Sequence, residues 1–500
     1  MTFQKDATPV TSEPQAKPAT HDSTHPPALL EFMTRDWKPG ARVVSRIANA
    51  SAFNSRRRVL SARFPGEWLI IPTGHEKVRA NDTYYRFRPG SDFFYLTGDT
   101  EPDCVLILEP LPGGHRDLLF VEPNPGRSDA TFFTDRSKGE LWVGPRLGVE
   151  QSRTRFAVDE TRSLSDLDTT LEKARADRVR VLRGFSDKVD RQIPIGEERD
   201  KELATFLSEM RLIKDKVEIR ELEAAIASTR RGFEDVIRRL QDSGTERHVE
   251  GIFNLRARVE GNDAGYGTIA AAGAHACVLH WTRNDGPLNP GELLLLDAGV
   301  ETNSLYTADI TRTLPISGRF SREQREIYEL VYAAQAAAFE AVRPGNDFLE
   351  PNRQAMRVLA EGLEELGILP TSADEALKEE NQFYKRYTLH NISHMLGLDV
   401  HDCAQARQEV YKFGKLKPGM VLTVEPGLYF QKDDLTVPAR YRGIGVRIED
   451  DVLVTAKGMR HLSQEIPSAP DDVEAWIADV WGDSASKPRR RRLLRKRRAR

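Results

Sequence analysis

Short apolar runs separated by turn residues dominate the chain from about residue 31 to about residue 205. Glu67–Pro72, Cys104–Leu108 and Asp117–Val121 each have the length and the residue types of a buried strand. Helical stretches such as Asp166–Asp177 accompany them. The pattern therefore predicts an α/β domain over residues 31–205.

A helical period replaces this pattern further along the chain. Over residues 198–240, apolar side chains recur at approximately helical spacing. Two further helical patterns, near 322–342 and 352–366, are accompanied by several pairs of strand-like runs. We expect a boundary near residues 205–215 and a second domain over residues 206–470, so that the fold class is α/β (α+β).

The two ends differ from the body in composition. Residues 1–30 are rich in Pro, Thr, Ser and Ala and lack the basic start and apolar middle of a secretory signal. We expect them to be a disordered leader of a cytoplasmic protein. The last section, residues 471–500, ends in a tail in which ten of the final fourteen residues are Lys or Arg. We expect this tail, residues 487–500, to be disordered.

The tail changes the charge distribution of the chain. The formal net charge is −3, and it would be −13 without the ten tail cations, so the body is acidic. Such a tail can attract nucleic acid or anionic lipid. Because no aromatic residue or groove-reading motif accompanies the charges, we favour a solvated extension without a dedicated partner. No apolar run approaches the roughly 20 residues of a membrane span, so we expect no membrane insertion.

Cysteine is scarce in this sequence. Cys104, Cys277 and Cys403 are far apart and odd in number. This argues against a disulfide framework or a cysteine-rich zinc site and fits a reducing compartment. Cys277 and Cys403 lack a clear base partner, so we interpret both as packing residues.

Acidic residues stand in strands where an apolar residue is expected. The run Leu293–Gly299 contains Asp297, and Asp309 follows twelve residues later. A hairpin centred near Asn303 would place these two carboxylates opposite each other. Facing carboxylates on buried strands repel unless a cation or a proton lies between them.

The same device occurs again near the end of the second domain. Val421–Gly427 contains Glu425, and Ile444–Asp450 contains Glu449. Strand alternation places Arg447 and Glu449 on one face. Glu425 and Glu449 are therefore a second candidate pair of inward carboxylates.

Histidines gather near these strands. His390, His394 and His401 fall within twelve residues, and His280 comes earlier. Four carboxylates with at least one imidazole form a ligand set for two hard or borderline divalent cations, such as Mn²⁺, Co²⁺ or Mg²⁺. A two-metal site suits amide hydrolysis.

These residues lie in longer motifs that resemble those of the Xaa-Pro aminopeptidases (aminopeptidase P), which are pita-bread metallopeptidases. Beyond the acidic strands, the first domain contributes a similar motif at Tyr85–Gly98. The matching segments of the second domain are Cys277–Trp281, Leu296–Gly299, Ala308–Thr313, His394–Asp402, Val424–Tyr429 and Gly443–Asp451. The resemblance implies an N-terminal mixed α/β domain followed by a pita-bread catalytic domain with a pseudo-two-fold antiparallel sheet.

The resemblance also implies roles for individual residues. The metal ligands would be Asp297, Asp309, His394, Glu425 and Glu449. The catalytic residues would be Glu425, His280, His401 and Arg447, and the substrate-binding residues would be His280, His390, His401 and Tyr429. Two divalent ions are implied, with Mn²⁺ preferred and Co²⁺ or Zn²⁺ as alternatives. A hydroxide held between them would attack the Xaa-Pro amide of a peptide substrate.

Several alternatives remain open at this point. Prolidase, which cleaves Xaa-Pro dipeptides, has the same ligands, whereas methionine aminopeptidase does not need the first domain. A non-catalytic pita-bread protein that binds peptides or proteins, or the metal-free creatinase, is expected to have some ligands replaced, and all five are present here. His275 and Trp281 stand where many relatives have Asn and Tyr. Relatives form dimers or tetramers, so we expect an oligomer.

Overall fold

The computed structural model describes residues 25–38 and 43–486 of the chain. It divides into two compact units, Met1–Leu203 and Ala204–Arg500. The boundary expected between residues 205 and 206 falls inside helix α9 (Glu197–Met210), which spans this division. Among the described residues, no helix is long and apolar enough to cross a membrane.

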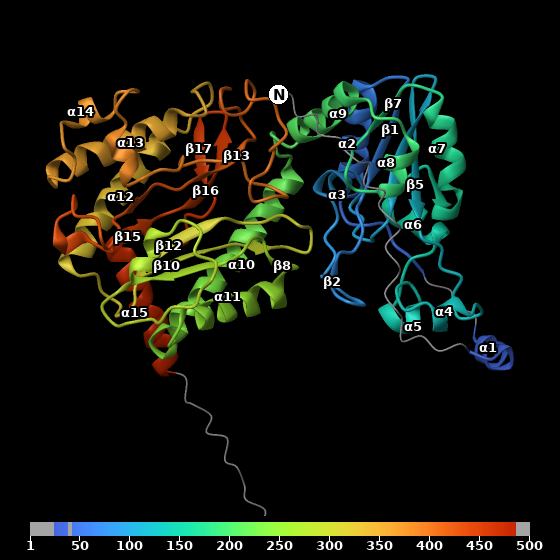
Figure 1. Cartoon of the computed structure of the whole chain (residues 1–500), viewed down its shortest axis with the longest axis horizontal. Helices are drawn as coiled ribbons and strands as arrows, with labels where there is room; N and C mark the ends of the chain where they lie inside the picture. The colour runs from blue at the N-terminus through green and yellow to red at the C-terminus, as the bar shows by residue number, and fades with distance from the viewer. Residues whose placement is uncertain (1–24, 39–42, 487–500) are drawn as a thin grey trace, which may run out of the picture. The chain divides into compact units, whose positions relative to one another are not determined.

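The first unit is built on one mixed sheet of five strands in the order β6-β5-β4-β1-β7 (Figure 1). Its outer pairs, β1 with β7 and β5 with β6, are parallel, and the inner pairs are antiparallel. The strands of the unit are β1 (Trp68–Pro72), β2 (Val78–Ala80), β3 (Thr83–Tyr84), β4 (Val105–Leu111), β5 (Gly114–Val121), β6 (Glu160–Ser163) and β7 (Val179–Val181). The helices are α1 (Pro27–Thr34), α2 (Ala50–Arg63), α3 (Ser91–Thr97), α4 (Thr131–Thr134), α5 (Glu140–Val143), α6 (Val149–Phe156), α7 (Leu167–Arg175) and α8 (Asp187–Gln192).

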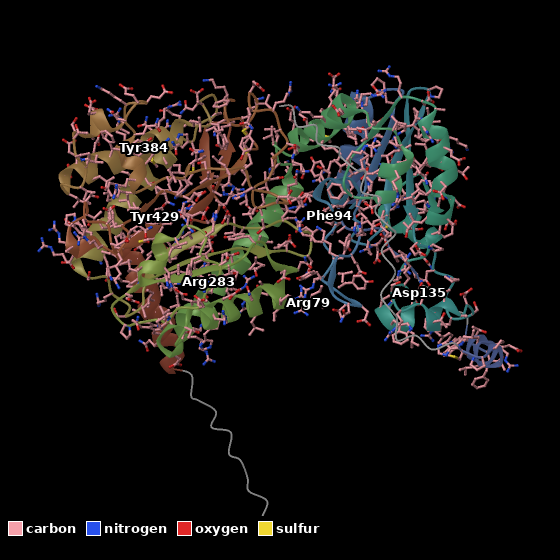
Figure 2. The ribbon with its side chains drawn as sticks, viewed as in Figure 1. Arg79, Phe94, Asp135, Arg283, Tyr384 and Tyr429 are labelled. Carbon is pink, nitrogen blue, oxygen red and sulfur yellow. The ribbon has the colours of Figure 1, made fainter. Side chains whose placement is uncertain are left out.

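The apolar runs of this unit form its interior. Trp68, Ile70, Val105 and Ile107 belong to a single buried cluster on the sheet. Phe94, which Figure 2 labels on α3, is also buried. Because helix α1 begins at Pro27, the leader predicted for residues 1–30 extends too far; residues 1–24 lie outside the described part of the chain.

The second unit contains two three-stranded antiparallel sheets, β12-β10-β9 and β13-β16-β17. Its strands are β8 (Asp263–Ala264), β9 (Ile269–Ala272), β10 (Leu293–Ala298), β11 (Val300–Glu301), β12 (Ile310–Pro315), β13 (Val421–Val424), β14 (Gly427–Tyr429), β15 (Gly445–Arg447), β16 (Asp450–Thr455) and β17 (Gly458–His461). Its helices are α10 (Lys216–Arg239), α11 (Glu246–Glu260), α12 (Arg322–Ala341), α13 (Glu350–Glu365), α14 (Ala373–Ala376) and α15 (Pro470–Ser486). An isolated bridge between Thr311 and Glu449 joins the two sheets.

Each of these sheets has a pair of long helices beside it. Helices α10 and α11 pack together, with α11 on β8 and β9 (Figure 1). Helices α12 and α13 pack together, with α12 on β13, β14 and β15. Apolar residues from both halves form one continuous core. The arrangement repeats on the two sides of the bridge at Glu449, where the site lies.

Two helix boundaries differ from the sequence expectation. The helical stretch over residues 198–240 is interrupted because the Asp215 carboxylate accepts hydrogen bonds from the backbone N–H groups of Val217 and Glu218, which begins α10. At the other end, residues 471–486 belong to α15 and not to a separate segment. Its apolar stripe, which includes Trp476 and Ile477, is buried in the core of the second unit. The basic tail, 487–500, lies outside the described residues.

The cysteine prediction agrees with the structure. Cys104, Cys277 and Cys403 are all buried and free of disulfides. Burial raises the pKa of the Cys277 thiol to about 12, so this thiol is unreactive at neutral pH.

Candidate metal centre

Four carboxylates reach the centre of the second unit from strand ends. Asp297 ends the apolar part of β10, where Leu293–Leu296 are buried, and Asp309 precedes β12. Glu425 lies between β13 and β14, and Glu449 lies between β15 and β16. The apolar strands fix the backbone, and each strand end therefore delivers one charged side chain to the same place.

The register of β10 with β12 corrects the hairpin expected from the sequence. Asp297 pairs with Thr311 and not with Asp309, because the connection is centred near Ser304 instead of Asn303. Gly299 allows the chain to close here: a Cβ on it would lie 1.7 Å from the Ala308 carbonyl oxygen. The two aspartates are thus diagonal neighbours on one face.

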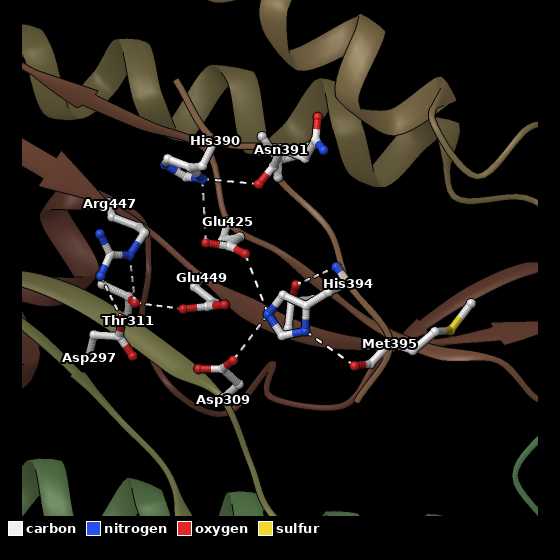
Figure 3. Close-up of polar contacts among 12 residues, drawn as sticks. Asp297, Asp309, Thr311, His390, Asn391, His394, Met395, Glu425, Arg447 and Glu449 are labelled. Carbon is white, nitrogen blue, oxygen red and sulfur yellow. Dashed lines mark hydrogen bonds and ion pairs between the residues drawn. The ribbon is translucent and has the colours of Figure 1, made fainter. Parts of the chain in front are cut away.

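Three donors are close enough to share a metal ion. Ligand atoms of Asp309, His394 and Glu449 all lie within 4.8 Å of one another. Nε2 of His394 is 3.3 Å from Oδ2 of Asp309 and 3.5 Å from Oε1 of Glu425 (Figure 3). Carboxylate and imidazole groups in this number are a donor set that fits divalent cations.

Arg447 organises the opposite side of the cluster. Its guanidinium donates to Oδ2 of Asp297 at 2.5 Å, to the Tyr429 hydroxyl at 3.1 Å and to Oγ1 of Thr311 at 3.2 Å. Thr311 in turn donates to Oε2 of Glu449 at 2.6 Å. One arginine therefore orients both Asp297 and, through Thr311, Glu449.

The buried carboxylates outnumber the positive charge that Arg447 supplies. Burial, together with the neighbouring carboxylates, raises the pKa of Asp297 and of Glu449, and it raises the pKa of Glu425 to about 7. Burial opposes the charged form of His394 as well, but Asp309 and Glu425 raise its pKa to about 9. The site thus favours added positive charge, which a divalent cation supplies.

These donors face a cavity of about 540 Å³. His280, His390 and His401 line it together with the apolar side chains of Ile269 and Leu279. The rings of His394 and His401 have centroids 4.4 Å apart. The volume and the mixed lining suit the end of a peptide.

Tyr429 lies beside Arg447, and the cavity lining does not support the substrate contact predicted for it. It is not among the described residues that line the cavity; its hydroxyl is shared by Arg447 and by Nε2 of His390, which is 2.8 Å away. Nδ1 of His390 lies 3.6 Å from Glu425. Burial and the nearby Arg447 lower the pKa of His390 to about 4, so the ring is neutral and accepts from Tyr429.

Two residues of the site were missed from the sequence. Tyr266 lines the cavity and donates to Oδ1 of Asp297 at 2.7 Å, and Thr311 joins Arg447 to Glu449. Thr311 follows Asp309 by two residues, and strand alternation places two such side chains on one face, so this spacing could have indicated the threonine. No local pattern indicates Tyr266, because its partner lies 31 residues away.

Comparison with known proteins places this geometry in a family. Residues 220–456 match Metallopeptidase family M24, and residues 53–182 match the Aminopeptidase P, N-terminal domain. Xaa-Pro aminopeptidase 1 of Streptomyces coelicolor is 50% identical over 459 residues, which cover 91% of this chain and 92% of that protein. The Escherichia coli Xaa-Pro aminopeptidase is 33% identical, covering 85% of this chain and 96% of its own.

Solved structures agree with the sequence relatives. Aminopeptidase P from E. coli with the inhibitor Pro-Leu superposes with a TM-score of 0.78 at 31% identity, covering 87% of this chain and 99% of that one. Proline aminopeptidase P II from Yersinia pestis gives 0.77 at 33% identity, with 86% and 99% covered.

The fold and the donor set define a metallopeptidase with the pita-bread catalytic domain, as predicted. Within that class, the chain belongs to the Xaa-Pro aminopeptidase (aminopeptidase P) family. It is a metal-dependent aminopeptidase, and a non-catalytic binding role is not supported.

Proposed function

We propose that this chain releases the N-terminal residue from peptides whose second residue is proline. The observation that carries the proposal is the 50% identity to Xaa-Pro aminopeptidase 1 over 91% of the chain. An inhibitor that begins with proline, Pro-Leu, accompanies the aminopeptidase P of E. coli. That ligand supports a site that accepts proline on the leaving side of the cut.

We assign the five donors to two divalent ions. Asp297, Asp309, His394, Glu425 and Glu449 would hold these ions between them. The support is the set of carboxylates around one cavity, in which Asp297, Asp309 and Glu449 are buried and Glu425 is half-buried. Mn²⁺ suits this oxygen-rich set best, with Co²⁺ or Zn²⁺ as alternatives. The E. coli relative has also been obtained with Zn substituted.

When bound, the ions supply Lewis-acid activation of the scissile carbonyl and of the attacking water. Glu425 accepts a proton from that water as its oxygen adds to the carbonyl carbon. It then delivers the proton to the prolyl nitrogen as the C–N bond breaks. His280 and His401, on the cavity wall, donate hydrogen bonds to the carbonyl oxygen while negative charge develops there.

The remaining polar groups orient these partners. Arg447 holds Asp297 at 2.5 Å and keeps a positive charge beside the carboxylates. His390 lines the cavity next to Glu425 and contacts the substrate, whereas Tyr429 positions His390 and Arg447. The substrate α-amino group is held by the acidic surroundings of the site.

Glu425→Gln tests the mechanism directly. It keeps the volume but removes the proton acceptor, so we expect turnover to fall roughly 10³-fold or more. Circular dichroism should stay close to wild type, and so should the melting temperature when both proteins are compared in EDTA. Glu465→Gln is the matched control, because the Glu465 side chain is 84% exposed and, within the part of the chain that the structure describes, pairs with Arg230 alone. Near-normal turnover of the Glu425 variant would refute its role.

A substrate series tests the specificity. We expect Mn²⁺-dependent cleavage of Xaa-Pro-Yaa peptides, with loss of activity in a chelator and no cleavage of an N-blocked peptide. Cleavage of the Xaa-Pro dipeptide alone would identify a prolidase instead. A dimeric or tetrameric assembly and a cytoplasmic location stay predictions from the sequence, and the assembly is testable by sedimentation.

A further inference from the structure

The cavity wall that carries His280 is an irregular loop. Residues 278–292 lie between the 3₁₀ helix Gly273–Cys277 and β10 and belong to neither a helix nor a strand. His280 and Thr282 of this loop line the cavity. The backbone of this loop is bonded near Gly286 and Leu288, and no strand ladder holds the residues around His280, so side-chain contacts help to fix their position.

Glu246, the first residue of α11, joins this loop to the core at several points, and the buried Asn284 amide of the loop adds bonds to Thr268 and Ala270. It is fully buried, and its carboxylate accepts four hydrogen bonds. Oε1 accepts from the Ala272 backbone at 2.7 Å and lies 2.8 Å from Nδ1 of His275. Oε2 accepts from the Trp281 indole at 2.8 Å and from the Gly286 backbone at 2.6 Å. One carboxylate thus joins β9, the 3₁₀ helix and two points of the loop.

The two side chains that reach Glu246 also stack on each other. The rings of His275 and Trp281 have centroids 3.9 Å apart and an interplanar angle of 26°. On the same loop, the guanidinium of Arg283, labelled in Figure 2, lies 5.6 Å from the Trp281 ring. Leu279 and Trp281 pack against a small buried cluster that includes Leu295 and Tyr429. His280 stands between these two packed residues, so the fixed indole sets where its imidazole lies.

We propose that Glu246 is a positioning residue for the His280 wall of the cavity and acts through Trp281 and His275. This inference rests on the proposed function, in which His280 contacts the scissile carbonyl. Glu246 does not line the cavity among the described residues, so its effect on turnover passes through the loop. His275 and Trp281 are thereby assigned to holding the loop and not to contacting the peptide.

Trp281→Phe is the decisive variant. It keeps an aromatic ring for the stack and removes the indole N–H that reaches Glu246. We expect kcat to fall about tenfold with little change in KM, because a small displacement of His280 weakens an interaction made in the transition state. Hydrogen exchange of residues 278–286 should become faster. Trp476→Phe is the control: Trp476 is buried on α15, and within the described chain its indole nitrogen has no hydrogen-bond partner.

A double-mutant cycle with His280→Ala separates positioning from general destabilisation. If the loop acts through His280, Trp281→Phe should cost almost nothing further in the His280→Ala background. Independent, multiplying losses, or unchanged exchange of residues 278–286, would overturn the proposal. Glu246→Gln should give a larger loss than Trp281→Phe, but its burial makes misfolding a risk, so the Trp281 variant decides. If the wild type fails to cleave Xaa-Pro peptides, the proposed function fails, whereas faster loop exchange in Trp281→Phe still supports the anchor.

Discussion

Two groups of buried charged side chains in the second unit differ in the balance between carboxylates and cations. At the metal centre, Asp297, Asp309, Glu425 and Glu449 face one another with Arg447 as the main cation. At the other group, Asp402 meets two cations, Lys214 at 3.0 Å and Arg211 at 2.9 Å, and Arg211 also lies 3.7 Å from Asp399, so that carboxylates and cations are balanced.

The pKa values follow this balance. Burial alone would raise the pKa of Asp402, but Lys214 and Arg211 hold it at about 2. At the metal centre burial and like charges act together, and the pKa of Glu425 rises to about 7. A buried carboxylate that is paired with neighbouring cations holds the fold together. Buried carboxylates that outnumber the cations around them form a site for an added cation. Asp402 directly follows His401 in the chain, so the matched group also supports the cavity wall.

The largest effect on activity is expected from Glu449→Gln at the metal centre. Removing one ligand should lower kcat/KM with Mn²⁺ by roughly 10³-fold or more, because the ions supply several kcal/mol of transition-state stabilisation. In EDTA the variant should be at least as stable as wild type, since one repelling charge is gone. Activity assays and thermal unfolding in EDTA measure the two effects. An EDTA-treated variant that melts several degrees below wild type would contradict the excess-charge interpretation.

Lys214→Met, at the group around Asp402, should lower the stability of the fold whether or not metal is present. It leaves Asp402 buried with one cation fewer, which costs about 3–5 kcal/mol of unfolding free energy. Urea unfolding should show the same loss with Mn²⁺ and with EDTA. Lys415→Met is the control, because the Lys415–Asp347 pair is exposed, so solvent and salt screen it and its loss should barely change stability. Equal losses in the two variants would mean that Asp402 is not held by charge matching.

The gain in unfolding free energy on adding Mn²⁺ distinguishes variants of the metal centre from variants of the group around Asp402. At a hundredfold excess over Kd, Mn²⁺ should stabilise wild type by about 2.7 kcal/mol for each ion bound, by mass action. Lys214→Met should gain the same increment from its lower starting point, and Glu449→Gln should gain much less. Denaturation curves with and without Mn²⁺ measure these increments. An equal gain in all three proteins would place the binding outside the carboxylate cluster.

The metal centre was predictable from the sequence to a large extent because carboxylates in apolar strands are rare and stand out locally. The two buried contacts that hold the cavity wall, Lys214 with Asp402 and Glu246 with Trp281, could not be predicted from the sequence. Lys214 and Asp402 are 188 residues apart, and Glu246 is 35 residues from Trp281, so no local spacing indicates either contact. The periodicity of apolar residues predicted which segments are helices and which are strands. The break before α10 depends on the Asp215 cap, and the register of β10 with β12 depends on where the connection between them is centred, and neither could be read from periodicity.

The pH dependence of Asp402 gives the smallest and most specific test. Its pKa is about 2 in the folded protein against an ordinary value of 3.8, so the carboxylate stabilises the fold above pH 4. That contribution, roughly 2 kcal/mol, is lost as the pH falls from about 4 to about 2. The stability difference between wild type and Asp402→Asn, measured by urea unfolding at a series of pH values, should therefore shrink below pH 4, by about half of that amount at pH 3. A difference that stays constant down to pH 3 would mean that Lys214 and Arg211 do not hold the carboxylate charged, and the contrast between matched and excess buried charge would then not hold.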